Sequence, residues 1–195
     1  LLIMSKDNLK IDSNLEKYTN ILKKNLKYIA IVFTFLFIAF VFLIFLENQQ
    51  EKKQILFSEI FINAKLLLEQ NKTNDAKLIL EDLVDKKNKF YSTLSLSLII
   101  SNELEKDINK IIKMFDKVLS IKSLENEELN LIRYKKTIFL AKNNKTQELL
   151  ESANIIINSN SEWRNEVINL LGEYFLSKGE KLKSEEYFNL LNVKK

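Results

Sequence analysis

INLLGEYFLSKGEKLKSEEYFNLL, residues 168–191, holds the only two glycines in a chain of 195 residues. Apolar residues recur at three- and four-residue spacing on both sides of a polar cluster around Gly179, which predicts two helices joined by a tight turn. Gly179 falls where such a turn requires a positive φ, and Gly172 falls where the first helix must approach the second closely. The stretch therefore predicts an antiparallel helical hairpin.

Upstream segments repeat this pattern, which resembles the tetratricopeptide (TPR) repeat. If Ala76, Ile111, Leu149 and Ser184 are equivalent, the repeats are separated by 35, 38 and 35 residues, close to the period of about 34 in TPR proteins. The third pair fits poorly because Arg133 and Lys136 occupy normally apolar places, so we expect a distorted or register-shifted pair there. The residues expected at structural repeat positions are Ala64, Ala76, Leu80, Phe115, Trp163, Leu171, Gly172, Phe175, Gly179 and Phe188.

Polar clusters divide residues 50–193 into about eight predicted helices of 11–20 residues. Hydroxyl groups that could accept hydrogen bonds from the first free amides of these helices are expected at Thr73, Ser123, Thr146 and Ser161. Loops this short favour antiparallel neighbouring helices. The predicted fold class is all-α, with one N-terminal transmembrane helix followed by a TPR-like α-solenoid of about four helix pairs. A generic helical bundle is the alternative.

The composition excludes several classes of protein. Two glycines and no proline argue against sandwiches, barrels and glycine-rich nucleotide sites, and the absence of Cys and His removes disulfides, thiolate or imidazole metal sites and His-based catalysis. Adjacent carboxylates such as Glu127-Glu128 point in different directions on a helix and cannot share a substrate. We therefore expect no enzymatic activity, no catalytic or metal-binding residues, no cofactor and no small-molecule substrate.

An uncharged run of 19 residues, Tyr28 to Leu46, is long enough to cross a membrane. The alternatives are a buried core helix, which would carry polar residues on one face, and a cleaved signal peptide, which would be shorter and followed by small residues. The predicted organisation is a short basic cytoplasmic N-terminus (1–27, with Met4 as the expected initiator), the membrane helix (28–46) and a repeat domain (47–195). The excess of lysine before the run predicts that the repeat domain lies across the membrane, counting Lys17, Lys23, Lys24 and Lys27 against Lys52 and Lys53.

Net charge is uneven along the chain. Residues 1–46 carry six lysines against three acidic residues, whereas residues 47–195 carry 24 basic against 23 acidic residues. Because a nucleic-acid-binding domain carries a concentrated basic face, no nucleic-acid partner is expected.

The arrangement of basic stub, membrane helix and degenerate repeats resembles the YfgM-like proteins, ancillary subunits of the bacterial Sec translocon. The most specific local match is Asn160-Ser161-Glu162-Trp163-Arg164 leading into Leu171-Gly172. The resemblance implies a bacterial inner-membrane protein with a periplasmic TPR-like domain. It also implies three kinds of partner: Sec translocon subunits, a PpiD-like periplasmic chaperone and secretory polypeptides.

Stacked repeats would form a concave surface for protein partners. The residues expected on it are Phe61, Lys65, Leu68, Leu96, Ile100, Glu173 and Leu176. The alternative is that these residues pack against neighbouring parts of the same chain, and Trp163 is likewise expected to be a packing residue. Two functions remain open at this stage: an adaptor of the translocon, or a structural scaffold for cell-envelope or outer-membrane assembly without a link to secretion.

Overall fold

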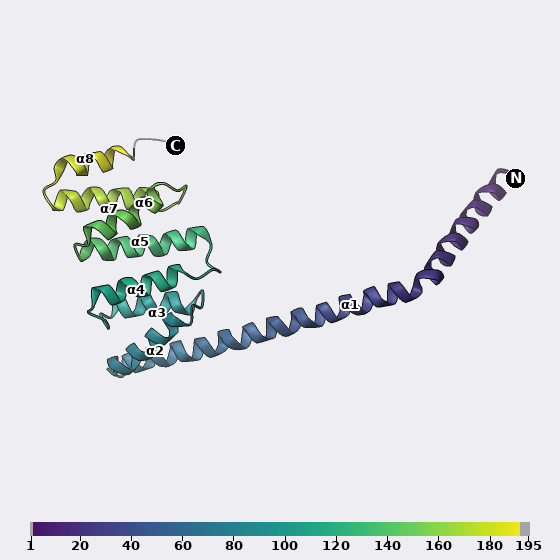
Figure 1. The fold of residues 1–195 in the computed structure, drawn as a ribbon, viewed down its shortest axis with the longest axis horizontal. Coiled ribbons are helices and arrows are strands. Elements are labelled where there is room, and N and C mark those ends of the chain that lie inside the picture. Colours follow the sequence, from purple (N-terminus) through teal and green to yellow (C-terminus); the bar gives the residue numbers. More distant parts are fainter. Residues whose placement is uncertain (1, 192–195) are drawn as a thin grey trace. The chain divides into compact units, whose positions relative to one another are not determined.

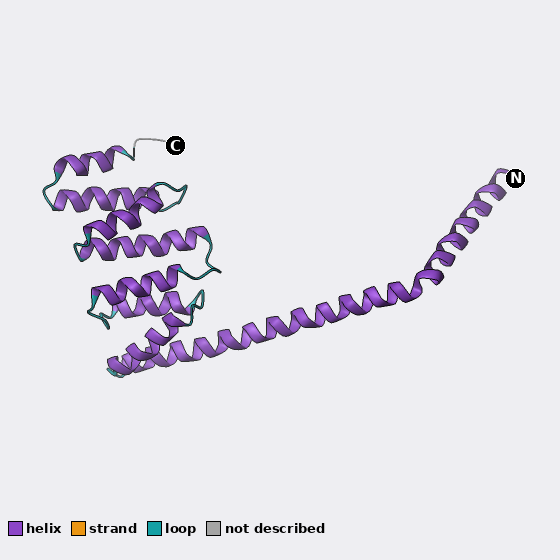
Figure 2. Cartoon of the chain, viewed as in Figure 1, coloured by secondary structure: helices purple, strands orange, loops and turns teal. Residues whose placement is uncertain are grey.

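A computed structural model describes the backbone of residues 2–191, and the side chains of residues 24–191 except 29, 47 and 48; Lys17 and Lys23 of the topology argument lie outside the described side chains. The described residues form eight helices and no strand, which confirms the all-α prediction (Figure 2). The helices are α1 (Leu2–Glu69), α2 (Thr73–Asp85), α3 (Tyr91–Ser101), α4 (Ile108–Leu119), α5 (Asn126–Lys142), α6 (Thr146–Ile157), α7 (Arg164–Ser177) and α8 (Lys181–Asn189). Within residues 50–193 one length differs from the expected 11–20 residues, since α8 has nine. The part of α1 in this range, 50–69, has 20 residues and is continuous with the apolar run before it.

The chain divides into two compact units, Leu1–Ile55 and Leu56–Lys195, which are called here the N-terminal unit and the hairpin unit. The N-terminal unit contains the apolar run within α1. Each large apolar side chain between Ile31 and Leu46 is 43–72% exposed. By length and composition, the part of α1 from Lys24 to Glu69 is long and apolar enough to cross a membrane.

In the hairpin unit, helices that follow one another in sequence pack against one another, and Figure 1 shows α2 to α8 stacked in chain order. The same backbone turn closes four of the connections. Its central residue has a positive φ of 60° at Asn71, 50° at Glu103, 55° at Asn144 and 78° at Gly179. The following amide donates to the carbonyl five residues earlier, as in Lys72 N to Leu67 O (2.9 Å) and Glu180 N to Phe175 O (2.9 Å). This is the Schellman motif, which satisfies the free carbonyls at a helix end.

These turns set a common register for the four helices that precede them. The residue seven positions before each turn residue is buried, and these residues are Ala64, Leu96, Thr137 and Gly172. A Cβ on Gly172 would lie 2.5 Å from Cε1 of Phe188, so α7 and α8 approach as closely there as the sequence predicts. Gly179 likewise has the positive φ expected of it.

The register corrects the prediction for the second pair. The connection from α3 to α4, residues 102–107, has six residues, whereas the other three equivalent connections have three. The three additional residues shift α3 by three positions relative to the sequence alignment. As a result Leu96 is a core residue, whereas the sequence pattern placed it on the concave surface, and Glu103 is the turn residue.

Glu105 fixes this longer connection to α2. Its carboxylate lies 2.9 Å from Lys77 Nζ and 3.0 Å from Lys110 Nζ, and it accepts from the backbone amides of Lys106 (2.8 Å) and Asp107 (2.9 Å). The Asp107 amide and the two ammonium groups lower the pKa of Glu105 to about 2. Asp107 then caps α4 by accepting from the amides of Asn109 and Lys110.

The predicted helix caps are partly wrong. Thr73 and Thr146 are the first helical residues of α2 and α6, and neither helix has a side-chain cap. At α5 the cap is a reciprocal pair formed by Glu125 and Glu128, and Ser123 is not involved. Ser161 does accept from the amide of Trp163, at 3.2 Å, immediately before α7.

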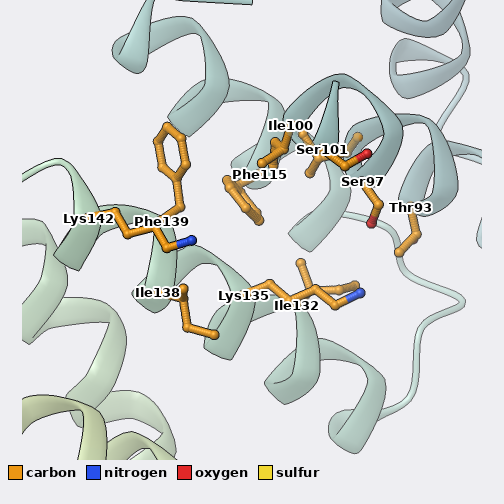
Figure 3. A pocket seen from close by; sticks show the side chains of 11 residues that line it. Thr93, Ser97, Ile100, Ser101, Phe115, Ile132, Lys135, Ile138, Phe139 and Lys142 are labelled. Carbon is orange, nitrogen blue, oxygen red and sulfur yellow. The ribbon is translucent and has the colours of Figure 1, made fainter. Parts of the chain in front are cut away.

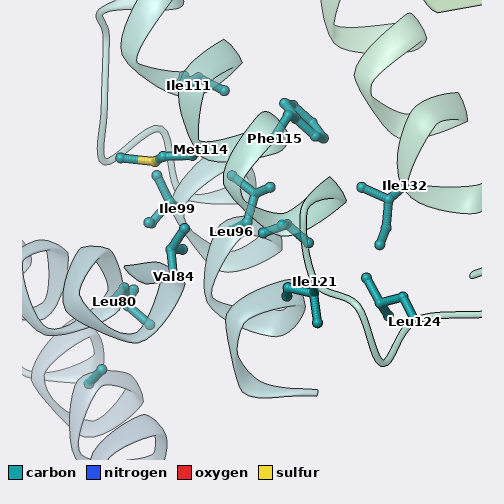
Figure 4. Close-up of a cluster of buried hydrophobic side chains, with 12 residues drawn as sticks. Leu80, Val84, Leu96, Ile99, Ile111, Met114, Phe115, Ile121, Leu124 and Ile132 are labelled. Atoms are coloured by element: carbon teal, nitrogen blue, oxygen red, sulfur yellow. The ribbon is translucent and has the colours of Figure 1, made fainter. Parts of the chain in front are cut away.

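Two apolar clusters form the core of the hairpin unit. The first joins the end of α1 to α2, α3, α4 and the start of α5 (Figure 4), and its largest fully buried side chains include Leu80, Ile99, Phe115 and Val118. The second joins α5 to α8 and includes Leu140, Leu149, Leu171 and Phe175.

The third pair, α5 and α6, has the regular three-residue turn, so the distortion expected there lies instead in the α3–α4 connection. Its two charged residues are accommodated by polar partners: Arg133 donates to Asn130 (3.0 Å), and Lys136 pairs with Asp116 on α4 (2.6 Å). A buried hydrogen bond between the Thr137 and Ser152 hydroxyls (3.2 Å) joins the two helices.

Candidate protein-interaction surface

A cavity of about 320 Å³ opens between α3 and α5 (Figure 3). It is lined by Thr93, Leu96, Ser97, Ile100 and Ser101 of α3, by Phe115 of α4, and by Ile132, Lys135, Ile138, Phe139 and Lys142 of α5. All of these residues belong to the hairpin unit. They place the cavity between the first helices of the second and third pairs.

The inner wall of the cavity is apolar and tightly packed. Leu96, Phe115 and Ile132 are almost fully buried, and the Phe115 and Phe139 rings lie 5.9 Å apart at 46°. Ile138 and Ile100 are half-buried and reach the opening. Such a wall offers apolar contact to a ligand.

Helix α3 packs against α2, and the side of α3 that faces α5 is left uncovered. Ser92 and Ser95 of α3 are fully buried, and the Ser92 hydroxyl donates to Leu83 O of α2 at 2.6 Å. Small side chains allow this close approach. Helix α5 in turn packs on α4, α6 and α7. The cavity therefore lies between the second pair, α3 and α4, and the first helix of the third pair, α5.

The opening has a different charge on its two sides. Helix α3, from Tyr91 to Ser101, has no charged residue, whereas Lys135 and Lys142 of α5 are exposed at the opening. These two lysines take part in none of the ion pairs among the described residues. The surface is thus apolar with cationic groups on one side.

Only part of the predicted interaction surface is found at this cavity. Ile100 lines it, half-buried, and Leu96 lines it from the core with 3% of its surface exposed. Leu96 is therefore mainly a packing residue, and the prediction that it lies on an exposed concave surface is wrong.

The other predicted residues lie elsewhere. Phe61 and Leu68 are half-buried at the end of α1 and pack on the first cluster, with the Phe61 ring 6.0 Å from that of Tyr91. Both residues therefore make the contacts within the chain that the alternative interpretation expects. Lys65 is exposed on α1, and Glu173 and Leu176 are exposed on α7, outside the cavity.

The sequence interpretation missed the α5 side of the surface. Ile138, Phe139 and the two lysines were not assigned because Arg133 and Lys136 obscured the register of this helix. The signal that could have found them is Asn143-Asn144, since a turn at Asn144 fixes the register of α5 from its C-terminal end.

Other sites of chemical interest are few. Among the described residues, no group of three or more His, Cys, Asp or Glu side chains is placed to hold a metal ion. Trp163 packs on the second cluster and stacks on Tyr134 at 5.3 Å, while Arg164 Nε donates to Ile157 O at 3.2 Å. This pair of residues fastens the last hairpin to the one before it.

No protein-family model, curated protein or solved structure matches this chain.

Proposed function

We propose that the chain is a single-pass membrane protein of the bacterial inner membrane whose hairpin unit is a TPR-like adaptor that binds other proteins in the periplasm. The observation that carries this proposal is the apolar cavity between α3 and α5, at the junction of two neighbouring helix pairs. Grooves between stacked helical pairs bind helices and extended peptides through apolar contacts.

The repeated turns support the TPR-like arrangement. Four helix ends share one backbone geometry and one buried position seven residues earlier, so each pair presents its first helix in the same register. A single pair cannot bury its apolar face alone, which favours stacking of the pairs into one continuous core. The departure at the α3–α4 connection is a local insertion of three residues.

The exposed apolar run supports the anchor. Large apolar side chains from Ile31 to Leu46 are exposed in the part of the chain that the structure describes, and in water such a surface would be strongly unfavourable. A bilayer supplies the missing environment. The lysine excess before the run then favours a cytoplasmic N-terminus and a periplasmic hairpin unit.

The resemblance to the YfgM-like proteins supplies the proposed partners, which are Sec translocon subunits, a PpiD-like chaperone and emerging secretory polypeptides. Trp163 and Arg164, which carry the most specific part of that resemblance, fasten the last hairpin. Their role in the fold is compatible with the family without identifying a partner.

Photo-crosslinking in living bacteria tests this proposal. A photoreactive amino acid with a short aliphatic diazirine side chain, chosen so that most of the cavity stays open, replaces Ser97, which lines the cavity. In a matched control it replaces Lys181, which is exposed on α8. We expect position 97 to capture Sec channel subunits, a periplasmic chaperone or secretory polypeptides, and position 181 to capture them much less. Capture of cytosolic proteins alone at position 97 would contradict the proposal, and capture of outer-membrane assembly factors with normal export would favour the scaffold function.

A further inference from the structure

We propose that the α3–α5 cavity binds an acidic amphipathic helix, with apolar side chains entering the cavity and two carboxylates, about two helical turns apart, on Lys135 and Lys142. This inference rests on the proposed function, because it names the chemistry of the partner that the same surface would take.

The spacing of the two lysines is the first argument. They are seven residues apart on α5, so they lie on nearly the same face of the helix and are separated by about 10 Å along its axis. The other cations of this helix are engaged: Lys136 pairs with Asp116, and Arg133 bonds Asn130. Lys135 and Lys142 have no acidic partner among the described residues, so these two remain for a ligand.

The size and lining of the cavity are the second argument. A helix with its side chains is about 10 Å across, so a cavity of about 320 Å³ accepts side chains and leaves the helix itself outside. Ile100, Ile138 and Phe139 provide apolar contact at the opening. A partner helix lying over the opening would insert residues at i, i+3 or i+4, the usual pattern of helix recognition.

The distance between the charges favours a peptide over a lipid. A fatty acid or a similar single-headed lipid has only one anionic group, whereas the two lysines leave α5 at points about 10 Å apart along the helix axis. An acidic helix presents carboxylates at i and i+7 with the same spacing as the lysines. The uncharged α3 on the opposite side allows the apolar face of such a helix to rest there without unpaired charge.

Selection from a peptide library tests the proposal. The full chain in lipid nanodiscs is used to select from displayed 18-residue helical peptides in which seven surface positions are randomised. The same selection is made on the Lys135→Glu/Lys142→Glu variant and on a control variant, Lys122→Glu/Lys181→Glu, which has the same net charge and alters two exposed lysines outside the cavity. Helical content and thermal unfolding of each variant are compared first, and all three proteins should match.

We expect the unaltered chain and the control to enrich helices with acidic residues at i and i+7 flanking apolar residues. Such a peptide should bind the Lys135→Glu/Lys142→Glu variant about tenfold more weakly, and high salt should weaken its binding to the unaltered chain. Ser97→Phe, which occupies part of the cavity without changing charge, should also weaken binding.

Two results of the selection would overturn the proposal: enrichment of peptides without an acidic bias, or selection of the same peptides by the charge-reversed variant. A third contrary result would be that no peptide is enriched while the chain binds oleate and Ser97→Phe weakens that binding. The crosslinking experiment at position 97 separates this failure from that of the proposed function. If crosslinking captures periplasmic proteins but no acidic helices are selected, the adaptor function stands and the partner chemistry is wrong.

Discussion

Replacing Gly172 by alanine would place a methyl group 2.5 Å from Cε1 and 2.6 Å from Cζ of Phe188. Carbon atoms in favourable contact are about 3.5–4.0 Å apart, so the Phe188 ring must move by about 1 Å or more. Overpacking of this kind costs about 1–3 kcal/mol. Alanine also stabilises a helix interior by about 1 kcal/mol relative to glycine. The expected net effect of Gly172→Ala is a loss of about 1 kcal/mol in the free energy of unfolding.

The second variant of this test removes the obstacle. In a Phe188→Ala background the new methyl group meets no ring, so only the gain in helix propensity remains. Gly172→Ala should then increase the free energy of unfolding by about 1 kcal/mol. The sign of the effect is expected to reverse, with a coupling energy between the two sites of about 2 kcal/mol.

The assay is urea unfolding of the full chain in nanodiscs, followed by the fluorescence of Trp163. This is the only tryptophan in the chain, and it packs on the second cluster that α7 and α8 help to form. If Gly172→Ala stabilises the unaltered chain, or destabilises both backgrounds equally, then close contact with Phe188 is not why glycine occupies this position.

Three further predictions concern the turns, the ion cluster and the register. Gly179→Ala should lower the free energy of unfolding by about 1 kcal/mol, because φ at this position is +78° and the added methyl group meets no other atom. The exposed control change Lys181→Ala should have almost no effect, and equal urea midpoints for the two variants would contradict the proposed role of the turn. Glu105→Gln should cost about 1–2 kcal/mol at pH 7 in urea unfolding, since the carboxylate is 9% exposed and its pKa is lowered from 4.5 to about 2. A lowered pKa stabilises the fold above pH 4.5, and this stabilisation is lost as the pH falls toward 2. The difference in stability between Glu105→Gln and the unaltered protein should therefore vanish over that range, and a difference that does not depend on pH would contradict the role of Glu105. Leu96→Ala should cost about 2–4 kcal/mol and Leu176→Ala less than about 1, because the first side chain is 3% and the second 52% exposed; similar thermal unfolding of the two variants would place Leu96 on the surface.

The sequence predicted the helical fold well where local chemistry determines it. The two glycines were assigned correctly because each meets a requirement that few other residues satisfy, a positive φ at Gly179 and a close approach at Gly172. The absence of proline and the scarcity of glycine likewise excluded strand-rich folds.

The register of the second pair could not be read in the same way. Apolar residues occur at six of eleven positions of α3, so periodicity alone does not distinguish its buried face from its exposed face. The decisive feature is Glu103, whose φ of 50° ends the helix although glutamate is not a residue that favours this conformation. The insertion that follows is held by Glu105 through contacts with α2 and α4, which depend on tertiary structure.

The interaction surface was harder to predict, for a related reason. Its apolar wall comes from two helices whose registers were respectively shifted and unassigned, and its position depends on Ser92 and Ser95 bringing α3 close to α2. Buried serines resemble surface residues in a sequence pattern. The lysines at 135 and 142 are similar in sequence to those that only solvate a helix face, and their significance depends on the cavity beside them.

The location of the hairpin unit relative to the membrane decides whether it can meet secretory proteins. A reporter enzyme that is active only outside the cytoplasm, fused after Lys195 in a bacterial host, measures this location, with a reporter active only inside as its counterpart. We predict that the first fusion is active, that the second is inactive, and that both remain in the membrane fraction after alkaline extraction. An active cytoplasmic reporter with an inactive external one, or release of the protein from the membrane, would contradict the anchored periplasmic adaptor.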